Sequence, residues 1–418
     1  MIFLAIALTI LGCIAVFNLK SPGKRIEHEI EPQGTLDSPN IKRSIGQLLG
    51  PPLVDGNLIT RLENGDEIFP AMLAAIRGAQ VSITFETFIY WSGAIGREVA
   101  EALSERARAG VHVHVLLDWI GANKFEASRF EEMRRAGVMV EWYRPLRWYN
   151  VSRINNRTHR KILVIDGKIG FTGGVGIADQ WRGHAQDEDH WRDCHFRVEG
   201  PVVAHLQAAF TDNWNATRPE VLHGNSYFPA LEAKGSCTAQ VFKSSPEEGS
   251  GSVRLMFLYS IAHAAATIRI ASAYFVPDSH VRACLIAACK SGVEVEVIVP
   301  GKYIDTAITR RASRAVWGDL LKAGVKIYEY QETMFHSKYM IVDKAWVSVG
   351  STNFDNRSFR LNDECNLNVI DAEWGQEMAE MFARDKARAK EITYAAWEKR
   401  PLLDKVIENL AFLARSQV

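Results

Sequence analysis

The sequence predicts an α/β protein built from two pseudo-symmetric units, each with a mixed sheet flanked by helices, behind an N-terminal transmembrane helix. Three observations support this prediction. The chain has 418 residues, which is too many for one ordinary hydrophobic core. Its two halves repeat one order of strand-like and helix-like segments, and residues 1–19 contain no charged side chain.

In the first half, apolar residues alternate between the two periodicities that distinguish helices from strands. Helix-like segments at 69–80 and 97–110 precede period-two segments at 81–90 and 111–119, and a further helix leads to a strand at 138–143. Spacing near 3.6 residues predicts amphipathic helices, and strict alternation predicts strands. The order is therefore strand, helix, strand, helix, strand.

The second half repeats this order. Helix-like segments at 254–266 and 280–292 precede strand-like segments at 267–277 and 293–301, and a later helix leads to a strand at 325–330. A duplicated unit commonly packs against its copy about a two-fold axis, so residues near that axis come in pairs.

Composition divides the chain into five parts. We expect a transmembrane anchor at 1–19, a linker rich in Pro, Gly and charge at 20–55, a first domain at 56–240, a second at 241–400 and an amphipathic helix at 401–418. A Ser, Gly and acid-rich stretch separates the two domains.

The uncharged segment 1–19 is just long enough to cross a bilayer core as a helix. It lacks the basic start of a cleaved signal peptide, and Lys20, Lys24 and Arg25 follow it. Basic residues stay preferentially on the cytoplasmic side, which favours a catalytic body in the cytoplasm.

Charge and cysteine content argue against several classes of function. The 49 basic and 49 acidic residues balance, so the chain has no overall field to hold a nucleic acid. Its six cysteines are scattered without a CxxC pair, which indicates neither a zinc site nor a disulfide framework. We expect no metal or other cofactor.

The pattern H-x-K-x4-D occurs once in each half. The two copies are His159, Lys161 and Asp166, and His336, Lys338 and Asp343. Because the chain contains only 12 histidines, two matches at the same place in a repeated unit favour function over coincidence.

Strand geometry accounts for the spacing. His159 and Lys161 are two residues apart and leave one face of a strand, whereas Ile162 and Val164 point to the other face. Asp166 has the opposite parity and lies in an Asp-Gly turn, so we expect it to organise the backbone there. The second copy repeats the arrangement.

If the halves meet about a two-fold axis, two imidazoles and two ammonium groups converge on one cleft. Two ammonium groups suit a phosphate, and an imidazole is a competent nucleophile toward phosphorus. A second imidazole is able to protonate the leaving oxygen and deprotonate the acceptor. The pattern thus favours a double displacement through a phosphohistidine, with the lysines supplying the positive charge that a metal would otherwise supply.

These motifs resemble the paired HKD signatures of the phospholipase D superfamily, and their surroundings resemble bacterial cardiolipin synthases. The segments at 159–174, 190–215, 272–278 and 335–369 carry the resemblance, which covers roughly residues 45–400. It implies two phospholipase D-like domains, a phosphatidyltransferase activity, phosphatidylglycerol as substrate and the bacterial inner membrane as location.

The resemblance also implies roles for the motif residues. His159 would be the nucleophile and His336 the general acid and base, an order that the near-symmetry leaves open. Lys161 and Lys338 would hold the phosphate together with Asn353.

Further residues are assigned by the same resemblance. Ser351, Gly173 and Gly174 would add donors around the phosphate. Glu364 follows His336 at a spacing similar to that of the carboxylate that orients a catalytic histidine in the family, and Asp193 would do the same for His159. The alternative is that both acids are ordinary surface carboxylates.

Three further features bear on substrate binding. Gly176 stands where many relatives have Asn, so the phosphate cage is expected to depend more on the second half. An insertion with Arg144, Arg147, Trp148, Tyr149, Arg153 and Arg157 suits either an anionic membrane or a packed loop. The C-terminal stripe of Leu403, Val406, Ile407, Leu410 and Leu413 suits either lipid or a protein surface.

The sequence therefore predicts a membrane-anchored phosphatidyltransferase that forms cardiolipin from phosphatidylglycerol. The alternatives are a hydrolase of the same chemistry, either a phospholipase D or a nuclease, and a catalytically silent membrane scaffold. Oligomeric state is not predicted.

Overall fold

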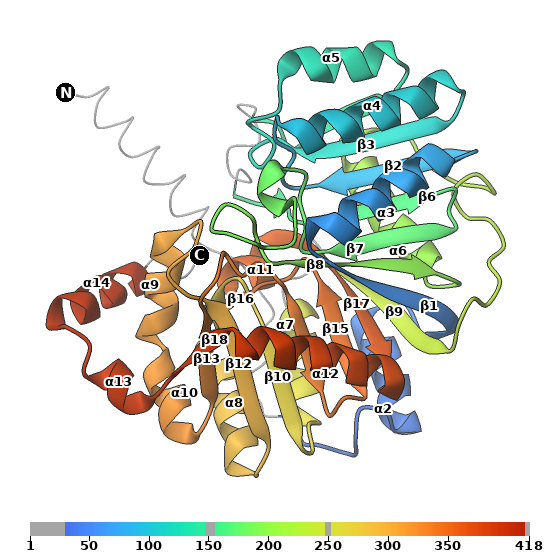
Figure 1. Cartoon of the computed structure of the whole chain (residues 1–418). Coiled ribbons are helices and arrows are strands. Elements are labelled where there is room, and N and C mark those ends of the chain that lie inside the picture. The colour runs from blue at the N-terminus through green and yellow to red at the C-terminus, as the bar shows by residue number, and fades with distance from the viewer. Residues whose placement is uncertain (1–29, 147–154, 247–251, 414–418) are drawn as a thin grey trace, which may run out of the picture.

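The two predicted halves form one continuous mixed sheet with helices on its faces (Figure 1). The structure is a computed structural model that describes residues 30–146, 155–246 and 252–413. Within this part of the chain, the repeated order of strands and helices predicted from the sequence is present in both halves.

The first half contains the elements up to α6. They are β1 (Val54–Glu63), α3 (Asn64–Gly78), β2 (Ser82–Thr87), α4 (Ala94–Arg108), β3 (His112–Asp118), α5 (Ala127–Arg135), β4 (Met139–Tyr143), β5 (Arg157–Thr158), β6 (Ile162–Ile165), β7 (Ile169–Gly173), the 3-10 helix η2 (Asp179–Trp181), β8 (Cys194–Glu199) and α6 (Val203–Thr217).

The second half repeats them and adds C-terminal helices. Its elements are β9 (Cys237–Ser244), α7 (Ser252–Ala262), β10 (Thr267–Ala271), β11 (Phe275–Val276), α8 (Ser279–Lys290), β12 (Glu294–Pro300), α9 (Ala307–Ala315), α10 (Trp317–Ala323), β13 (Lys326–Tyr330), β14 (Tyr339–Val342), β15 (Trp346–Gly350), β16 (Phe354–Asp355), α11 (Asn356–Arg360), β17 (Asn362–Ile370), α12 (Ala372–Ala387), β18 (Ala389–Ile392), α13 (Tyr394–Glu398) and α14 (Leu402–Leu413).

Strand order reads the same from both ends of the sheet. From one edge it runs β4-β3-β2-β6-β7-β8-β1, and from the other β13-β12-β10-β14-β15-β17-β9, with β18 added outside β13. In each half three strands are parallel and the remaining pairs are antiparallel. The halves join where β1 pairs with β9, so the pseudo-two-fold axis passes through the middle of the sheet.

Continuous apolar strands explain why both faces of the sheet are covered. Every residue of β2 is buried, as is every residue of β14 and β15. Helices α3 and α4 bury their apolar faces against the first half, and α7 and α8 do so against the second. A third apolar core, with α6 and α12, covers the sheet where the halves meet, which fixes the geometry of the site described below.

The aspartates of the two motifs organise turns, as their position predicted. Asp166 and Gly167 both have positive φ, as do Asp343 and Lys344, which suits the tight three-residue turns that join β6 to β7 and β14 to β15. The Asp166 carboxylate accepts bonds from the backbone amides of residues 80–82, and the Asp343 carboxylate from those of residues 265–267. Each carboxylate thereby ties a hairpin to the start of the strand beside it.

Three details of the sequence prediction need correction. Within the expected linker 20–55, residues Pro39–Leu49 form helix α2, because Ile41, Ile45 and Leu49 bury against the core of the second half. The predicted domain boundary at 240/241 falls inside β9. The motif His and Lys residues precede strands β6 and β14 instead of lying in them.

The predicted anchor, residues 1–19, lies outside the described residues. In the described part of the chain, no helix combines the length and the apolar character that a bilayer crossing requires. Cys194, Cys237 and Cys365 are buried free thiols.

Replacing the turn carboxylate should destabilise the second half. Asp343→Ala leaves three backbone amides without the acceptor that they contact at 2.7 to 2.8 Å. We expect the free energy of unfolding to fall by about 2 kcal/mol, since leaving amides unpaired costs about 1–3 kcal/mol. Thermal unfolding measures this. Glu131→Ala, which removes an exposed carboxylate, is the control, and equal melting temperatures for the two variants would contradict the assigned role.

Candidate active site

The segments that carry the two motif histidines cross from their own half to the other. Strand β5, just before His159, pairs with the start of β17, and the backbone amide of His159 donates to the backbone carbonyl of Asp363 at 2.8 Å. In the same way Phe335 pairs with Arg192, and the amide of His336 donates to the Arg192 carbonyl at 2.7 Å. Each histidine is therefore held by the backbone of the opposite half.

The carboxylates that orient the histidines are exchanged in the same way. Nδ1 of His159 lies 3.1 Å from both oxygens of Glu364, and Nδ1 of His336 lies 2.7 Å from Oδ2 of Asp193. The predicted pairing of Asp193 with His159 is wrong, because Asp193 binds His336. Spacing along the chain shows which carboxylates lie near the motifs, but the crossing of the backbone decides which histidine each one meets.

Each carboxylate is itself fixed by other donors. Asp193 accepts from the indole Nε1 of Trp181 at 2.9 Å and from the amide of Cys194 at 2.8 Å. Glu364 accepts from the hydroxyl of Ser351 at 2.5 Å. Both carboxylates are almost completely buried, so neither is the surface residue that the alternative interpretation required.

Protonation states follow from burial and from these partners. Burial disfavours the charged form of Glu364, but His159 and Lys161 outweigh it and lower the pKa of the carboxyl. His336 and Lys338 lower the pKa of Asp193 against the same effect of burial. Burial lowers the pKa of His159 to about 4. At neutral pH His159 is therefore a neutral imidazole that donates its Nδ1 hydrogen to a carboxylate, which leaves the Nε2 lone pair available.

The two motif lysines are buried close to each other's charge. Nζ of Lys161 donates to the carbonyl of His159 at 2.8 Å, and Nζ of Lys338 to that of His336 at 2.6 Å. Burial, together with the charge of Lys338, lowers the pKa of Lys161 to about 7, and burial lowers the pKa of Lys338. A bound anion would relieve the repulsion between them.

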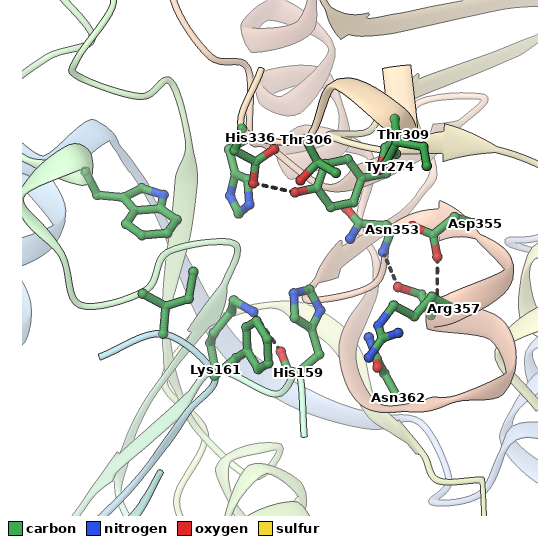
Figure 2. Close-up of a pocket in the computed structure, with 16 residues that line it drawn as sticks. His159, Lys161, Tyr274, Thr306, Thr309, His336, Asn353, Asp355, Arg357 and Asn362 are labelled. Atoms are coloured by element: carbon green, nitrogen blue, oxygen red, sulfur yellow. Dashed lines mark hydrogen bonds between the residues drawn. The ribbon is translucent and has the colours of Figure 1, made fainter. Parts of the chain in front are cut away.

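Both histidines face one cavity of about 250 Å³ (Figure 2). Its lining includes His159, Lys161, His336 and Asn353 from the predicted site, together with Phe88, Ile89, Trp181, Tyr274, Asp305, Thr306, Ile308, Thr309, Asp355, Arg357, Ser358 and Asn362. The structure thus brings together the four predicted residues in one place. Lys338 is buried against His336 behind this surface.

Asn353 has no matching amide on the first half. A side chain at its counterpart, Gly176, would come within 2.8 Å of Ile89 and 3.2 Å of Trp181. Asp355, Arg357 and Asn362 also line the cavity, and all belong to the second half. The expectation that the second half supplies most of the polar wall agrees with this lining.

Three residues predicted to bind phosphate lie elsewhere. The hydroxyl of Ser351 donates to Glu364, and the cavity lining includes neither Ser351 nor Gly173 nor Gly174. A side chain at Gly174 would come within 2.3 Å of the Asp193 carboxylate. Ser351 therefore holds the Glu364 carboxylate, and Gly174 leaves room for the Asp193 carboxylate. The predicted phosphate-binding role of the three residues needs correction, because none of them lines the cavity.

Sequence reasoning missed the residues that shape the cavity wall. Trp181 packs edge-on against His336 at 5.2 Å between ring centroids, and Phe88 packs against His159 at 5.3 Å. Tyr274 donates to Asp305 at 2.5 Å on the opposite wall. Of these aromatic residues, only Tyr274 lies in a segment that carried the family resemblance. The others could not be predicted, because no sequence pattern distinguishes an aromatic residue that lines a cavity from one that packs in the core.

The insertion before the first motif has mixed outcomes. Arg157 is buried and lies 3.5 Å from Asp118, so of the two alternatives a packed loop, and not contact with a membrane, describes this residue. Arg147, Trp148, Tyr149 and Arg153 lie outside the described residues. Across the residues that the structure describes, no group of His, Cys, Asp or Glu side chains has the geometry of a metal site.

A two-fold α/β sheet that presents one His from each half at a single cavity, with the motif Lys of each half beside its His, defines the phospholipase D superfamily. Residues 72–214 and 257–386 match the family described as cardiolipin synthase, PLD-like domain. The chain belongs to this cardiolipin synthase branch of the superfamily.

Individual relatives agree with this family. The chain is 32% identical over 397 residues to cardiolipin synthase 1 of Bacillus anthracis, covering 93% of this chain and 78% of the relative. It is 35% identical over 355 residues to a cardiolipin synthase of Geobacillus thermodenitrificans, covering 84% and 70% of the two chains.

Solved structures share the fold at low sequence identity. Phosphatidylserine synthase of Haemophilus influenzae aligns with a TM-score of 0.69 and 14% identity over 90% of this chain and 99% of its own. Polyphosphate kinase of Porphyromonas gingivalis aligns with a TM-score of 0.53 and 13% identity over 94% and 57%.

The exchanged pairing predicts which histidine responds to loss of a carboxylate. In Asp193→Asn, the pKa of His336 should fall, because a neighbouring negative charge stabilises the imidazolium, and that of His159 should not move. NMR titration of isotope-labelled imidazoles measures both. Glu364→Gln is the matched control and should move His159 alone. A shift of His159 in Asp193→Asn would contradict the exchange.

Anion binding should weaken as pH rises. A bound anion raises the pKa of Lys161 above its free value of about 7, so affinity is full below pH 7 and falls above it. Sulfate stays doubly charged over this range, and calorimetry between pH 6 and 9 should show a loss of up to about tenfold per pH unit. Lys161→Met should bind more weakly with a flatter profile. Constant affinity in the native protein would contradict the role.

Proposed function

We propose that the protein is a phosphatidyltransferase that transfers a phosphatidyl group to phosphatidylglycerol and forms cardiolipin. The observation that carries this proposal is the pair of imidazoles at one cavity, each hydrogen-bonded through Nδ1 to a buried carboxylate. Membership of the cardiolipin synthase family supplies the substrate class. The proposed transfer requires neither a metal nor another cofactor.

In the first step, Nε2 of His159 attacks the phosphorus of a donor phospholipid. The new N–P bond forms as the bond from phosphorus to the headgroup oxygen breaks, and the protonated His336 gives its hydrogen to that oxygen. Lys161 and Lys338 offset the negative charge that builds up on the phosphoryl oxygens. The headgroup leaves as an alcohol, and a phosphatidyl group stays on His159.

In the second step, the now neutral His336 removes the hydrogen from a hydroxyl of phosphatidylglycerol. The resulting oxygen attacks phosphorus, the N–P bond breaks, and His159 is regenerated. Glu364 and Asp193 stabilise the positive charge on each imidazole as it forms. Atoms and charge balance over the two steps, so one diester is exchanged for another.

The asymmetry of the site favours His159 as the nucleophile. Its side chain is 11% exposed, against 6% for His336. Nζ of Lys338 lies 3.1 Å from Nε2 of His336, whereas the described residues give Nε2 of His159 no such neighbour. Burial, and after it the charge of Lys338, lower the pKa of His336, so its imidazolium, once formed, gives up its proton readily, as a general acid must.

The cavity wall from the second half would hold the rest of the phosphate. Asn353 lines it, and its side-chain oxygen is buried without a hydrogen bond in the described part of the chain. Arg357 lines the same wall and adds a positive charge. We assign these residues to substrate binding, with His159, Lys161, His336 and Lys338 as the catalytic group, and Asp166 and Asp343 as turn-forming members of the motifs.

The membrane supplies both lipids, and we assign the protein to the bacterial inner membrane with a cytoplasmic catalytic body. Support comes from the uncharged segment 1–19 and the basic residues that follow it. In this proposal the anchor precedes two phospholipase D-like domains along the chain. Residues 36–49 pack on the second of these domains.

A substrate with a good leaving group separates the roles of the histidines. With a p-nitrophenyl ester of phosphatidic acid, the leaving oxygen needs no proton, so His336→Ala should still release a burst of p-nitrophenol and accumulate the covalent intermediate. His159→Ala should release no burst. Stopped-flow absorbance and mass spectrometry of the trapped peptide measure this, and the reverse result would exchange the two roles.

Product analysis tests the reaction itself. Incubation with phosphatidylglycerol vesicles should yield cardiolipin and glycerol, and both histidine variants should lower the rate by at least about 10³-fold. Phosphatidic acid as the main product would indicate a hydrolase instead, and cleavage of DNA a nuclease. Absence of any product and of any trapped phosphohistidine would indicate a silent scaffold.

A further inference from the structure

Helix α14 leaves an apolar stripe uncovered. Five large apolar side chains of this helix are between 55% and 79% exposed: Leu402, Leu403, Val406, Leu410 and Leu413. At 3.6 residues per turn they fall within an arc of about 100° of the helix surface. We call these five residues the α14 stripe. The sequence left open whether the apolar stripe of this helix binds lipid or a protein surface. The described part of the chain does not cover the α14 stripe.

The opposite face of α14 packs on α9. Glu408 is buried and accepts from Arg314 at 2.9 Å, and Ala411 clusters with Ala312. Higher residue numbers on α14 therefore lie beside lower numbers on α9, so the two helices are antiparallel. Figure 1 shows them side by side. The packing fixes the stripe to point away from the body of the protein.

The antiparallel packing directs the end of the stripe toward the catalytic cavity. Leu413 lies at the end of α14 that approaches the start of α9, and Ile308 stands at that start. Ile308 is 45% exposed and also lines the cavity that holds His159 and His336. Exposed apolar side chains thus stand both on α14 and at the opening of the site, and Arg310 and Arg311 of α9 line the groove between the two helices.

We infer that the α14 stripe inserts into the surface of the lipid bilayer that holds the substrate. The inference rests on the proposed function, because a phospholipid acceptor stays in the bilayer and its headgroup must reach the cavity from there. An in-plane helix with one apolar face is the usual device for such contact. Insertion of the stripe would place the opening beside Ile308 at the level of the headgroups.

Charge on the helix indicates that insertion is apolar and not electrostatic. The exposed or half-exposed charges of α14 are Asp404 and Lys405, which balance, and Glu408 is taken up by Arg314 and Arg400. Attraction to anionic lipid would need an excess of basic residues. Binding through the stripe itself should therefore depend little on salt concentration, and the exposed Arg311 of α9, which lines the groove beside α14, is the neighbouring charge that would add a salt-dependent contribution.

Two neighbouring positions provide a matched pair of variants. Leu410→Asp puts a negative charge inside the stripe, and Asn409→Asp puts one on the same exposed helix just outside it. Because both side chains are exposed, neither change should alter thermal unfolding. With the full chain and phosphatidylglycerol vesicles, we expect Leu410→Asp to lower the rate of cardiolipin formation about tenfold or more, and Asn409→Asp to leave it unchanged.

A soluble substrate separates this inference from the proposed function. With short-chain phosphatidylglycerol dispersed as monomers, Leu410→Asp should match the native rate, because no bilayer has to be reached. Loss of activity on both substrates, or retention on both, would overturn the inference. Absence of cardiolipin even in the native protein would instead count against the proposed function.

Depth measurement tests the contact without relying on catalysis. A spin label at Leu410→Cys, in a full-length background with Cys13, Cys284 and Cys289 replaced by Ser, should become more accessible to oxygen than to a nickel chelate when vesicles are added. Unchanged water exposure would overturn the inference. Spin–spin broadening between labels would indicate a second copy on the stripe, and immobilisation that is lost on removal of residues 1–19 would indicate that segment. Either result would also overturn it.

Discussion

The hydrogen bond between each histidine and a carboxylate of the opposite half is the interaction on which the site depends. Neither half holds an oriented imidazole by itself, because His159 needs Glu364 and His336 needs Asp193. The exchange is possible because the peptide segment before each histidine pairs with backbone of the other half, in one case with the start of β17 and in the other with Arg192, just before β8. Assembly of the sheet about its pseudo-two-fold axis and assembly of the site are therefore one event.

Duplication supplies the symmetry, and a few substitutions remove it where the chemistry needs two different roles. The counterpart of Asn353 is Gly176, where Ile89 and Trp181 already fill the space. One carboxylate is held by an indole and the other by a hydroxyl, from Trp181 and Ser351. Two imidazoles that began as equivalents thus face different walls of one cavity, which suits a nucleophile on one side and an acid on the other.

The same burial that fixes the site makes it costly to leave empty. Two ammonium groups are removed from water near each other, and their lowered pKa values express that cost. A bound phosphate diester would relieve it. The cavity is lined by Ile308 at the start of α9, the helix on which α14 packs. The proposed contact with a lipid surface would therefore place catalysis and attachment on one side of the second half.

By itself, the sequence determined the periodic elements, the duplication and the histidines and lysines of the site. These follow from local rules: alternation marks β2 and β10, helical spacing marks α4 and α8, and a repeated motif marks His159 and His336. The turn roles of Asp166 and Asp343 were likewise predictable from strand parity.

Only the tertiary structure decided which carboxylate meets which histidine, that Ser351 and Gly174 serve those carboxylates, and that Trp181 and Phe88 form the walls. Each of these depends on how segments far apart in the chain cross near the axis of the sheet. Spacing along one strand carries no information about the strand that lies beside it. The exposure of the α14 stripe belongs to the same class, since an apolar helical face reads identically whether a core or a bilayer covers it.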